Sequence, residues 1–300
     1  MNNYNYFVNK NNLEVIKVTV KERAVIIDTP LDSFIIIKGD INKYNYLLSR
    51  GFDYIPKIVD YDDKYIMFDN LEVVNYDFEE KLLDYVRVIS LLHIKTSYYK
   101  EVNSSYYKVI YEKIFSKIND VRNYYESLIS RIESREYMSP CEYLIARNIS
   151  QIFYIINICF NYLEKYYSMV KDKSNVRVVT LYNNDINKVI KTKDKIYLTD
   201  FSNSYVDSPI YDILYIYNNY YNNIELDTIL NIYFKVFKLS EDELLLIKLL
   251  SIIPSKIKVG MKVNDIIYVK KGINKIFKSI KILESNKEET SKTKEQKDNK

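Results

Sequence analysis

The sequence predicts an α+β fold, in which a small and mainly antiparallel sheet precedes a large helical region. Short β-branched runs separated by turn signals fill the first part of the chain, as in FIIIK at residues 34–38 after the turn TPLD. From Phe78 onward, apolar residues recur with helical spacing. Two further β-like runs, at residues 188–191 and 195–199, interrupt the helical region. Helices segregated from the sheet in this way are typical of the α+β class.

We expect residues 1–70 to form a small β-rich lobe that carries one short helix. The helix, at residues 41–50, is expected to end at Gly51, because glycine adopts the left-handed conformation of a helix C-cap without strain. Asp62 and Asp63 mark a turn between the last two strands. The expected strands cover residues 13–20, 24–28, 34–38, 58–61 and 65–68.

Residues 71–283 are expected to form the helical lobe. Ser139 and Glu142 form a capping box with Pro140 at the first helical position, and Ser240 and Glu243 form a second box. Residues 284–300 contain no large apolar side chain, and their five lysines and five acidic residues cancel, so we expect a disordered tail. The expected helices cover residues 78–94, 106–132, 139–170, a segment that begins at 208–209, and residues 227–237, 243–253 and 263–283.

Composition and charge exclude several classes of function. The net charge is +4 and the basic residues are dispersed, which is too mild to indicate a nucleic-acid partner or a membrane surface. The first twelve residues are polar, so we expect no signal peptide. The longest apolar run, at residues 244–254, contains Lys248 and is too short to span a membrane. We therefore expect a cytoplasmic protein without a membrane span.

The few cysteine and histidine residues exclude zinc and Cys-His or Ser-His-Asp chemistry. Cys141 and Cys159 are expected on one helix, about 27 Å apart at roughly 1.5 Å per residue, which is too far for a disulfide. A reducing compartment fits two free thiols. His93 is the only histidine, and the sequence offers no evident partner for it. We expect His93 to pack at the end of its helix, where a cation suits the helix dipole.

A polar hairpin within residues 176–212 carries the candidate site. Asn183, Asn184, Asp185 and Asn187 precede its first run, and Asp200 stands where its second run ends. Carboxylate and amide side chains at the open end of a hairpin can hold a metal ion and the phosphates that it carries. The same pattern also fits an ordinary surface hairpin, and the hairpin alone does not decide between the two.

Several segments, taken in their order, resemble a known family. They are FIIIK at 34–38, RGFDYIPKI at 50–58, SLLH at 90–93, KIYLTDF at 195–201, YVDSPIYDIL at 205–214 and LSEDELLLIKLLSIIPSK at 239–256. This order resembles the protein-kinase-like fold, within it the aminoglycoside phosphotransferase and choline kinase branch, and most narrowly the spore-coat CotS family of spore-forming Firmicutes. The resemblance covers most of residues 12–283 and implies a two-lobed fold, with a small antiparallel β lobe followed by a mainly helical lobe with an embedded β-hairpin.

The resemblance implies roles for three residues. Lys38 matches the lysine that anchors ATP, and Asp200 matches the aspartate that binds Mg²⁺. Asp212 matches an aspartate that braces the catalytic loop through backbone hydrogen bonds. The chain departs from the family pattern because residues 41–50 contain no acidic residue to pair with Lys38, and because Ser202 stands where a second carboxylate can occur.

The catalytic loop matches the family motif in two alternative registers. Counting back from Asp200 without a gap places Asn183 at the catalytic aspartate position and Lys188 at the metal-binding asparagine position. The other register aligns residues 183–185 with the motif and keeps Asp185 as the catalytic carboxylate, but it needs a deletion and misplaces Asn187 as a metal ligand. We favour the first register because it preserves the hairpin.

The favoured register predicts impaired chemistry. An asparagine cannot take a proton from a hydroxyl at neutral pH. A lysine at the metal position repels Mg²⁺, although its ammonium can stand in for a cation near phosphate. The expectation is a degenerate kinase-like protein, or pseudokinase, that acts as a binding or scaffold module in sporulation or spore-coat assembly, with spore-coat proteins as partners. It needs ATP and Mg²⁺ only if nucleotide binding is retained.

Two other functions stay open from the sequence. The alternative is an active phosphotransferase that uses ATP and Mg²⁺ on a small-molecule or protein hydroxyl, with Lys38, Asp185 and Asp200 in the site. A third hypothesis is a helical interaction domain unrelated to kinases, which a structure without a two-lobed cleft would favour.

Overall fold

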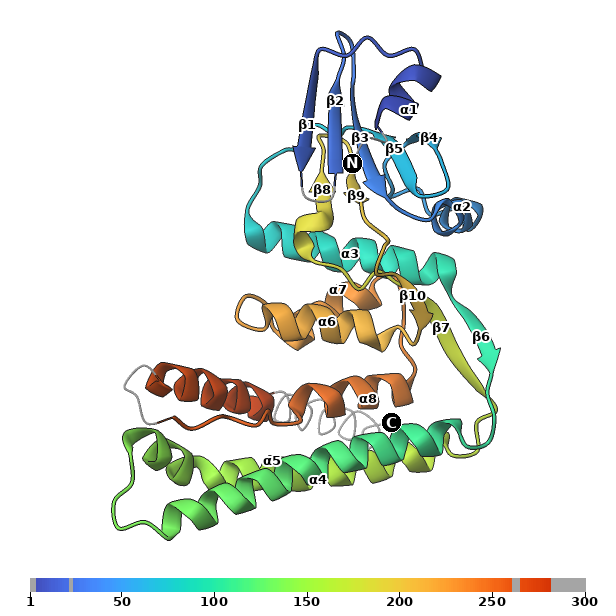
Figure 1. Ribbon diagram of the computed structural model, residues 1–300. Helices are drawn as coiled ribbons and strands as arrows, with labels where there is room; N and C mark the ends of the chain where they lie inside the picture. The colour runs from blue at the N-terminus through green and yellow to red at the C-terminus, as the bar shows by residue number, and fades with distance from the viewer. Residues whose placement is uncertain (1–3, 22–23, 261–264, 282–300) are drawn as a thin grey trace, which may run out of the picture. The chain divides into compact units, whose positions relative to one another are not determined.

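The computed structural model describes residues 4–21, 24–260 and 265–281 of the 300-residue chain. These residues divide into two compact units (Figure 1). The first combines Met1–Lys100 with Arg177–Lys238, and the second combines Glu101–Val176 with Leu239–Lys300. The lobe boundary expected at residue 70 stays a prediction, and the expected tail at 284–300 lies outside the described residues.

A five-stranded antiparallel sheet forms the N-terminal part of the first unit, in the strand order β1-β2-β3-β5-β4 (Figure 1). Its register pairs Ile36 of β3 with Val25 of β2 on one side and with Met67 of β5 on the other. All five strands lie where the sequence predicts strands, although the first begins later than expected. They are β1 (Lys17–Lys21), β2 (Ala24–Asp28), β3 (Ser33–Lys38), β4 (Ile58–Tyr61) and β5 (Tyr65–Asp69).

A short helix that the sequence did not indicate covers this sheet. Helix α1 (Tyr4–Lys10) belongs to a polar stretch, but its Phe7 is fully buried. Phe34 and Ile36, two residues apart on β3, lie on the same face of the sheet and pack against Phe7 in one apolar cluster with Ile27 and Met67. The segment is attached by the buried Phe7 and by the contacts of Lys10 and Asn11 with Asp60 of β4.

The rest of the first unit places the hairpin against α3 (Phe78–Thr96). Asp77 caps this helix by accepting the N–H of Glu79 at 2.9 Å. Strands β8 (Val189–Lys191) and β9 (Ile196–Leu198) pair antiparallel, which confirms the predicted hairpin. Strands β6 (Tyr98–Glu101), β7 (Asn175–Leu181) and β10 (Tyr205–Asp207) form a sheet of order β10-β7-β6, which belongs to the first unit except for residues 101 and 175–176. The unit also contains α2 (Ile41–Ser49), the short 3₁₀ helix η1 (Ile186–Lys188), α6 (Ile210–Tyr220) and α7 (Leu226–Phe234).

Three salt-bridged lysines and two backbone hydrogen bonds hold the hairpin in place. Lys191 contacts Glu80 and Asp84 of α3, and it lies 4.5 Å from the ring centre of Tyr76. Lys195 contacts Asp53, and Leu198 N–H donates to the carbonyl of Tyr54 at 2.8 Å. The hairpin is thus attached both to α3 and to the segment that follows α2. Further attachments are the pair of Lys188 with Asp200 and the hydrogen bond from Val74 N–H to the carbonyl of Lys191.

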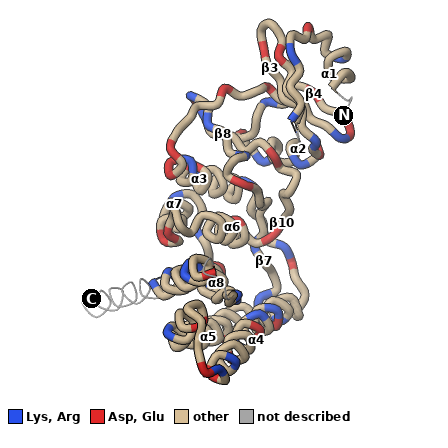
Figure 2. The backbone as a smooth tube through the Cα atoms, turned by 60° about the vertical axis from the view of Figure 1, so that its left-hand side comes forward, with Lys and Arg blue, Asp and Glu red and all other residues tan. Residues whose placement is uncertain are grey.

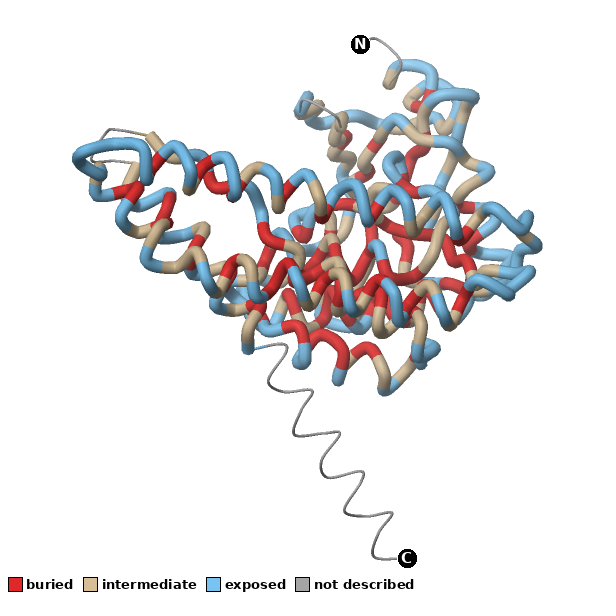
Figure 3. Tube along the Cα trace, turned by 90° about the horizontal axis from the view of Figure 1, so that it is seen from below, coloured by how far each residue is buried: buried red, intermediate tan, exposed pale blue. Residues whose placement is uncertain are grey.

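The second unit is helical. It contains α4 (Tyr106–Glu133), α5 (Pro140–Val170), α8 (Glu241–Ile252) and a helical segment at 265–281. Both predicted capping boxes are present: Ser139 with Glu142, and Ser240 with Glu243. Figure 3 shows buried and exposed positions alternating along the long helices, as helical periodicity requires. The expected helix at 263–283 is described only between 265 and 281, where it is helical.

Among the described residues, helix α5 is long and apolar enough to cross a membrane, by length and composition only. The core helix of a soluble protein meets the same criteria, so the expected absence of a membrane span stays a prediction. Cys141 and Cys159 both lie on this helix as buried free thiols, in agreement with the expected absence of a disulfide. Figure 2 shows basic and acidic residues interspersed along the chain, which agrees with the dispersed charge.

We predict that Gly51→Ala lowers the free energy of unfolding by about 1 kcal/mol. Gly51 ends α2 with φ +69°, and its N–H donates to the carbonyl of Leu48. An added Cβ meets only the Lys95 ammonium, at 3.6 Å, so the cost is one of backbone conformation rather than space. Gly51→Asn is the matched control, because asparagine tolerates the left-handed region and should cost less. Equal urea midpoints for all three proteins would contradict the prediction.

Candidate functional site

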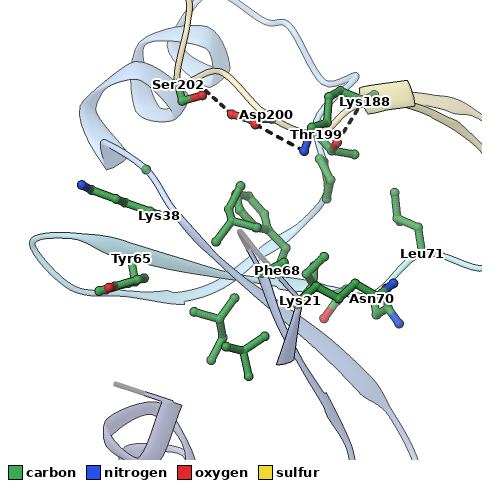
Figure 4. Close-up of a pocket in the computed structure, with 18 of the residues that line it drawn as sticks. Lys21, Lys38, Tyr65, Phe68, Asn70, Leu71, Lys188, Thr199, Asp200 and Ser202 are labelled. Carbon is green, nitrogen blue, oxygen red and sulfur yellow. Dashed lines mark hydrogen bonds and ion pairs between the residues drawn. The ribbon is translucent and has the colours of Figure 1, made fainter. Parts of the chain in front are cut away.

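A cavity of about 1130 Å³ lies in the first unit and is large enough for a nucleotide. Lys38 and Asp200, the two residues that the resemblance assigns to ATP and Mg²⁺, both line it (Figure 4). Lys188 and Asn187 line it as well, whereas Asn183 and Asp185 are not among its lining residues. The structure therefore brings together three of the five predicted site residues. The walls come from β1, β2, β3 and β5, from Tyr4 of α1, from residues 39–43 at the start of α2, from residues 56, 63–64 and 69–71, and from the segments around 187–190 and 199–202.

Asp200 is a partly buried carboxylate that stays ionised at neutral pH. One oxygen, Oδ1, accepts the N–H of Ser202 at 2.9 Å, and the other, Oδ2, lies 3.6 Å from the ammonium of Lys188. Burial raises its pKa, but the hydrogen bonds from Ser202 and the charge of Lys188 outweigh burial and hold the pKa below the ordinary value. Its low pKa makes Asp200 a ligand or charge partner rather than a base.

Lys188 is the cation that pairs with Asp200. It ends η1, and its backbone carbonyl accepts hydrogen bonds from Thr199 N, Thr199 Oγ1 and Tyr182 Oη at 3.1, 3.0 and 3.1 Å. These bonds fix the point from which its side chain leaves the backbone. Figure 4 shows Lys188 beside Asp200.

The donor set around Asp200 does not fit Mg²⁺ while Lys188 keeps this position. Two unit charges 4 Å apart interact by about 4 kcal/mol at an effective dielectric constant of 20, and a divalent ion roughly doubles this repulsion. Asn187 could supply a neutral amide oxygen, but Mg²⁺ sites in proteins rely on carboxylates and phosphate oxygens. The Asp200 carboxylate is already neutralised by the Lys188 ammonium.

Asn183 and Asp185, the two candidates for the catalytic position, have other contacts. Asn183 adopts φ +45°, a left-handed conformation that asparagine tolerates. Asp185 is exposed: its Oδ1 accepts the N–H of Asn187 at 2.8 Å and caps η1, and its Oδ2 accepts the hydroxyl of Tyr220 at 3.2 Å. The catalytic roles of both residues stay predictions.

Asp212 braces the loop before the hairpin, as the resemblance implies. Its carboxylate is 1% exposed and accepts the N–H groups of Tyr182 and Asn183 at 2.7 and 2.8 Å. His93 is also buried, with Nε2 3.1 Å from Asp212 Oδ2 and Nδ1 2.5 Å from the hydroxyl of Tyr233. The expectation that His93 lacks a partner was wrong. Its partners lie 119 and 140 residues further along the chain, where no local pattern reveals them.

Helix α2 contacts the Asp200 segment through two residues that sequence reasoning missed. The Lys43 ammonium donates to the carbonyls of Phe201, Ser202 and Ser204 at 3.1, 3.2 and 2.8 Å. Tyr44 Oη accepts the N–H of Phe201 at 3.4 Å. The helix that the family pattern would supply with an acidic residue instead directs a lysine at backbone carbonyls.

Lys38 has no ion-pair partner within the described part of the chain. Its side chain is exposed at the end of β3, and in Figure 4 it extends away from Asp200. This agrees with the departure noted in the sequence, where residues 41–50 offer no acidic side chain. An exposed ammonium at a cavity wall is available to an anionic ligand.

We predict that Asp212→Asn lowers the free energy of unfolding by about 1–3 kcal/mol, because an amide cannot accept all three of the bonds that the carboxylate now accepts. Asp194→Asn, at an exposed position of the hairpin turn, is the matched control and should leave stability unchanged. The measurements are urea unfolding and hydrogen exchange at the amides of Tyr182 and Asn183. Unaltered exchange at those two amides would show that Asp212 does not hold the loop.

Asp200 should also contribute to the loss of stability in acid. Because its pKa in the folded protein lies below its ordinary value, the stability it contributes is present above about pH 4 and is lost as the pH falls through the folded pKa. Asp200→Asn should therefore show a shallower decline of the urea midpoint between about pH 5 and about pH 3 than the unaltered protein. Parallel declines in the two proteins would contradict the assigned direction of the pKa shift.

The chain has a protein-kinase-like fold. No family model matches the sequence, and no curated protein matches it. Among solved structures, an aminoglycoside phosphotransferase from Alicyclobacillus acidocaldarius aligns with a TM-score of 0.64 at 8% identity, over 94% of this chain and 95% of that one. A choline kinase from Streptococcus pneumoniae aligns with a TM-score of 0.46 at 17% identity, over 94% and 99% of the two chains. At these identities the likeness concerns the fold alone. The chain shares with the first of these structures a small antiparallel sheet and a mainly helical remainder.

Proposed function

We propose that this protein is a nucleotide-binding, kinase-like protein with an impaired phosphoryl-transfer loop, and that it acts as a binding or scaffold module. One observation carries the proposal: the Lys188 ammonium lies 3.6 Å from Asp200 in the cavity that Lys38 also lines. Lys38 and Lys188 are two of the five lysines that line this cavity among the described residues, and ammonium groups suit the phosphates of a nucleotide.

The same arrangement explains why transfer would be slow. Phosphoryl transfer depends on metal ions that neutralise the developing charge and on a carboxylate that orients the attacking hydroxyl. In this protein Lys188 neutralises Asp200, and Asp185 is hydrogen-bonded to Tyr220 and to the backbone of η1. Asn183, in the favoured register, has no basic group that could accept a proton.

The resemblance to the CotS family supports the cellular part of the proposal. A kinase-like fold with impaired chemistry is better suited to bind partner proteins on its surface than to turn over a substrate. We assign it to sporulation or spore-coat assembly, as a cytoplasmic protein that associates with spore-coat proteins. Binding of coat proteins to the purified chain tests this assignment.

The second candidate function is an active phosphotransferase that uses ATP and Mg²⁺ on a small-molecule or protein hydroxyl. It is favoured by the presence of Asn187 and Asp200 on one cavity wall, because a carboxylate and an amide can together hold Mg²⁺. It requires the flexible Lys188 side chain, which is 37% exposed, to leave Asp200.

We predict that millimolar ADP or ATP raises the melting temperature by several degrees, since a ligand that binds only the folded state stabilises it by RT ln(1 + [L]/Kd). Lys38→Ala should weaken this effect, whereas Lys17→Ala should not, because Lys17 is an exposed lysine of the same sheet outside the cavity lining. The absence of any shift would rule out nucleotide binding. ATP turnover of about 1 s⁻¹ or more with hydroxyl acceptors, within the ordinary range of kinases, would rule out the impaired loop.

A further inference from the structure

We propose that nucleotide binding at this cavity needs no divalent metal ion, because the Lys188 ammonium itself bridges Asp200 and the phosphates of a nucleoside diphosphate. The inference rests on the proposed nucleotide binding and states which cation that binding requires. It follows from the disagreement between the residues present and the Mg²⁺ that the fold leads one to expect.

The ammonium has the donors to replace the ion. A metal ion in a phosphoryl-transfer site neutralises a carboxylate and contacts phosphate oxygens at the same time. A lysine ammonium carries three N–H donors in a tetrahedral arrangement. One can face Asp200 Oδ2, at 3.6 Å, and the other two are left for phosphate oxygens on the cavity side.

The backbone at both ends of the pair is held in place. On the Lys188 side, Thr199 and Tyr182 bind the Lys188 carbonyl. On the Asp200 side, Ser202 N–H binds Oδ1. Lys43 binds the carbonyls that follow Asp200. A site in which both partners leave a constrained backbone is preorganised for its ligand. Figure 4 shows the pair together at the cavity wall, with Lys38 on the opposite side of Asp200.

The charge at the site also favours a metal-free ligand. Lys38 has no ion-pair partner among the described residues, so its ammonium is available to a diphosphate that carries no bound cation. A nucleotide with bound Mg²⁺ would bring a second cation into the position that Lys188 occupies. The site therefore favours the metal-free nucleotide over its Mg²⁺ complex, because Lys188 repels the metal ion while the lysines attract the phosphates.

The test compares ADP binding to the full chain in excess Mg²⁺ and in excess EDTA by isothermal titration calorimetry. We expect the two dissociation constants of the unaltered protein to agree within about threefold. Lys188→Asn removes the ammonium and supplies an amide that a metal ion can use. This variant should bind ADP about tenfold or more weakly in EDTA, and Mg²⁺ should restore its binding.

Two further variants complete the design. Lys193→Asn, an exposed lysine of the hairpin turn outside the cavity lining, is the matched control and should behave as the unaltered protein does. Asp200→Asn should retain ADP binding in EDTA, because removal of the carboxylate charge leaves the Lys188 ammonium free to bind phosphate. If binding depended on a metal ion held by Asp200, this variant would not bind ADP. It also serves as the second test if Lys188→Asn does not fold.

The outcomes separate this inference from the proposed function. ADP binding by the unaltered protein that disappears in EDTA overturns the inference and leaves nucleotide binding in place. Full ADP binding by Lys188→Asn in EDTA also overturns it. The absence of ADP binding under both conditions overturns the proposed function and the inference together.

Discussion

The arrangement of the site depends on one buried carboxylate, that of Asp212. A carboxylate removed from water is unfavourable unless hydrogen-bond donors surround it, and here two backbone N–H groups and the His93 ring do so. Because the carboxylate only accepts, it fixes the orientation of Tyr182 and Asn183. The chain then enters η1 in a defined direction, and Lys188 follows at the end of that short helix.

His93 extends this arrangement from the loop into the helical part of the first unit. It lies on α3, contacts Asp212 of α6 through Nε2, and contacts Tyr233 of α7 through Nδ1. Since the carboxylate is an acceptor, Nε2 carries the hydrogen in this contact. Three helices are therefore tied to the loop by one histidine, which gives the only histidine of the sequence a structural role.

The fold by itself does not fix the reaction that a site performs. In this protein Lys38, at the end of β3, and Asp200, which follows the hairpin, both line one cavity. The chemistry depends on the few side chains that complete the site. Here a lysine pairs with the carboxylate, and a second lysine, Lys43, binds the backbone that follows it. Both lysines therefore make their contacts within the segments that form and adjoin the cavity.

The sequence by itself determined the features that depend on neighbouring residues. The β8–β9 hairpin, the two capping boxes and the end of α2 at Gly51 each follow from residues a few positions apart, where turn and cap chemistry acts. The order of such segments was also enough to indicate the fold. Lys38, Asp200 and Lys188 line one cavity, and their roles there stay predictions.

Only the tertiary structure decided the features that join distant parts of the chain. The attachment of α1 through Phe7, the sheet of β6, β7 and β10, and the contacts of His93 and Lys43 all span long separations. No periodicity or motif encodes them, because a side chain finds such a partner only after both segments have folded and packed. The pairing of Lys188 with Asp200 is more local, because the two residues flank the hairpin and the bond from Thr199 N–H to the Lys188 carbonyl extends its register. The sequence indicated the hairpin, and the structure showed that the ammonium faces the carboxylate.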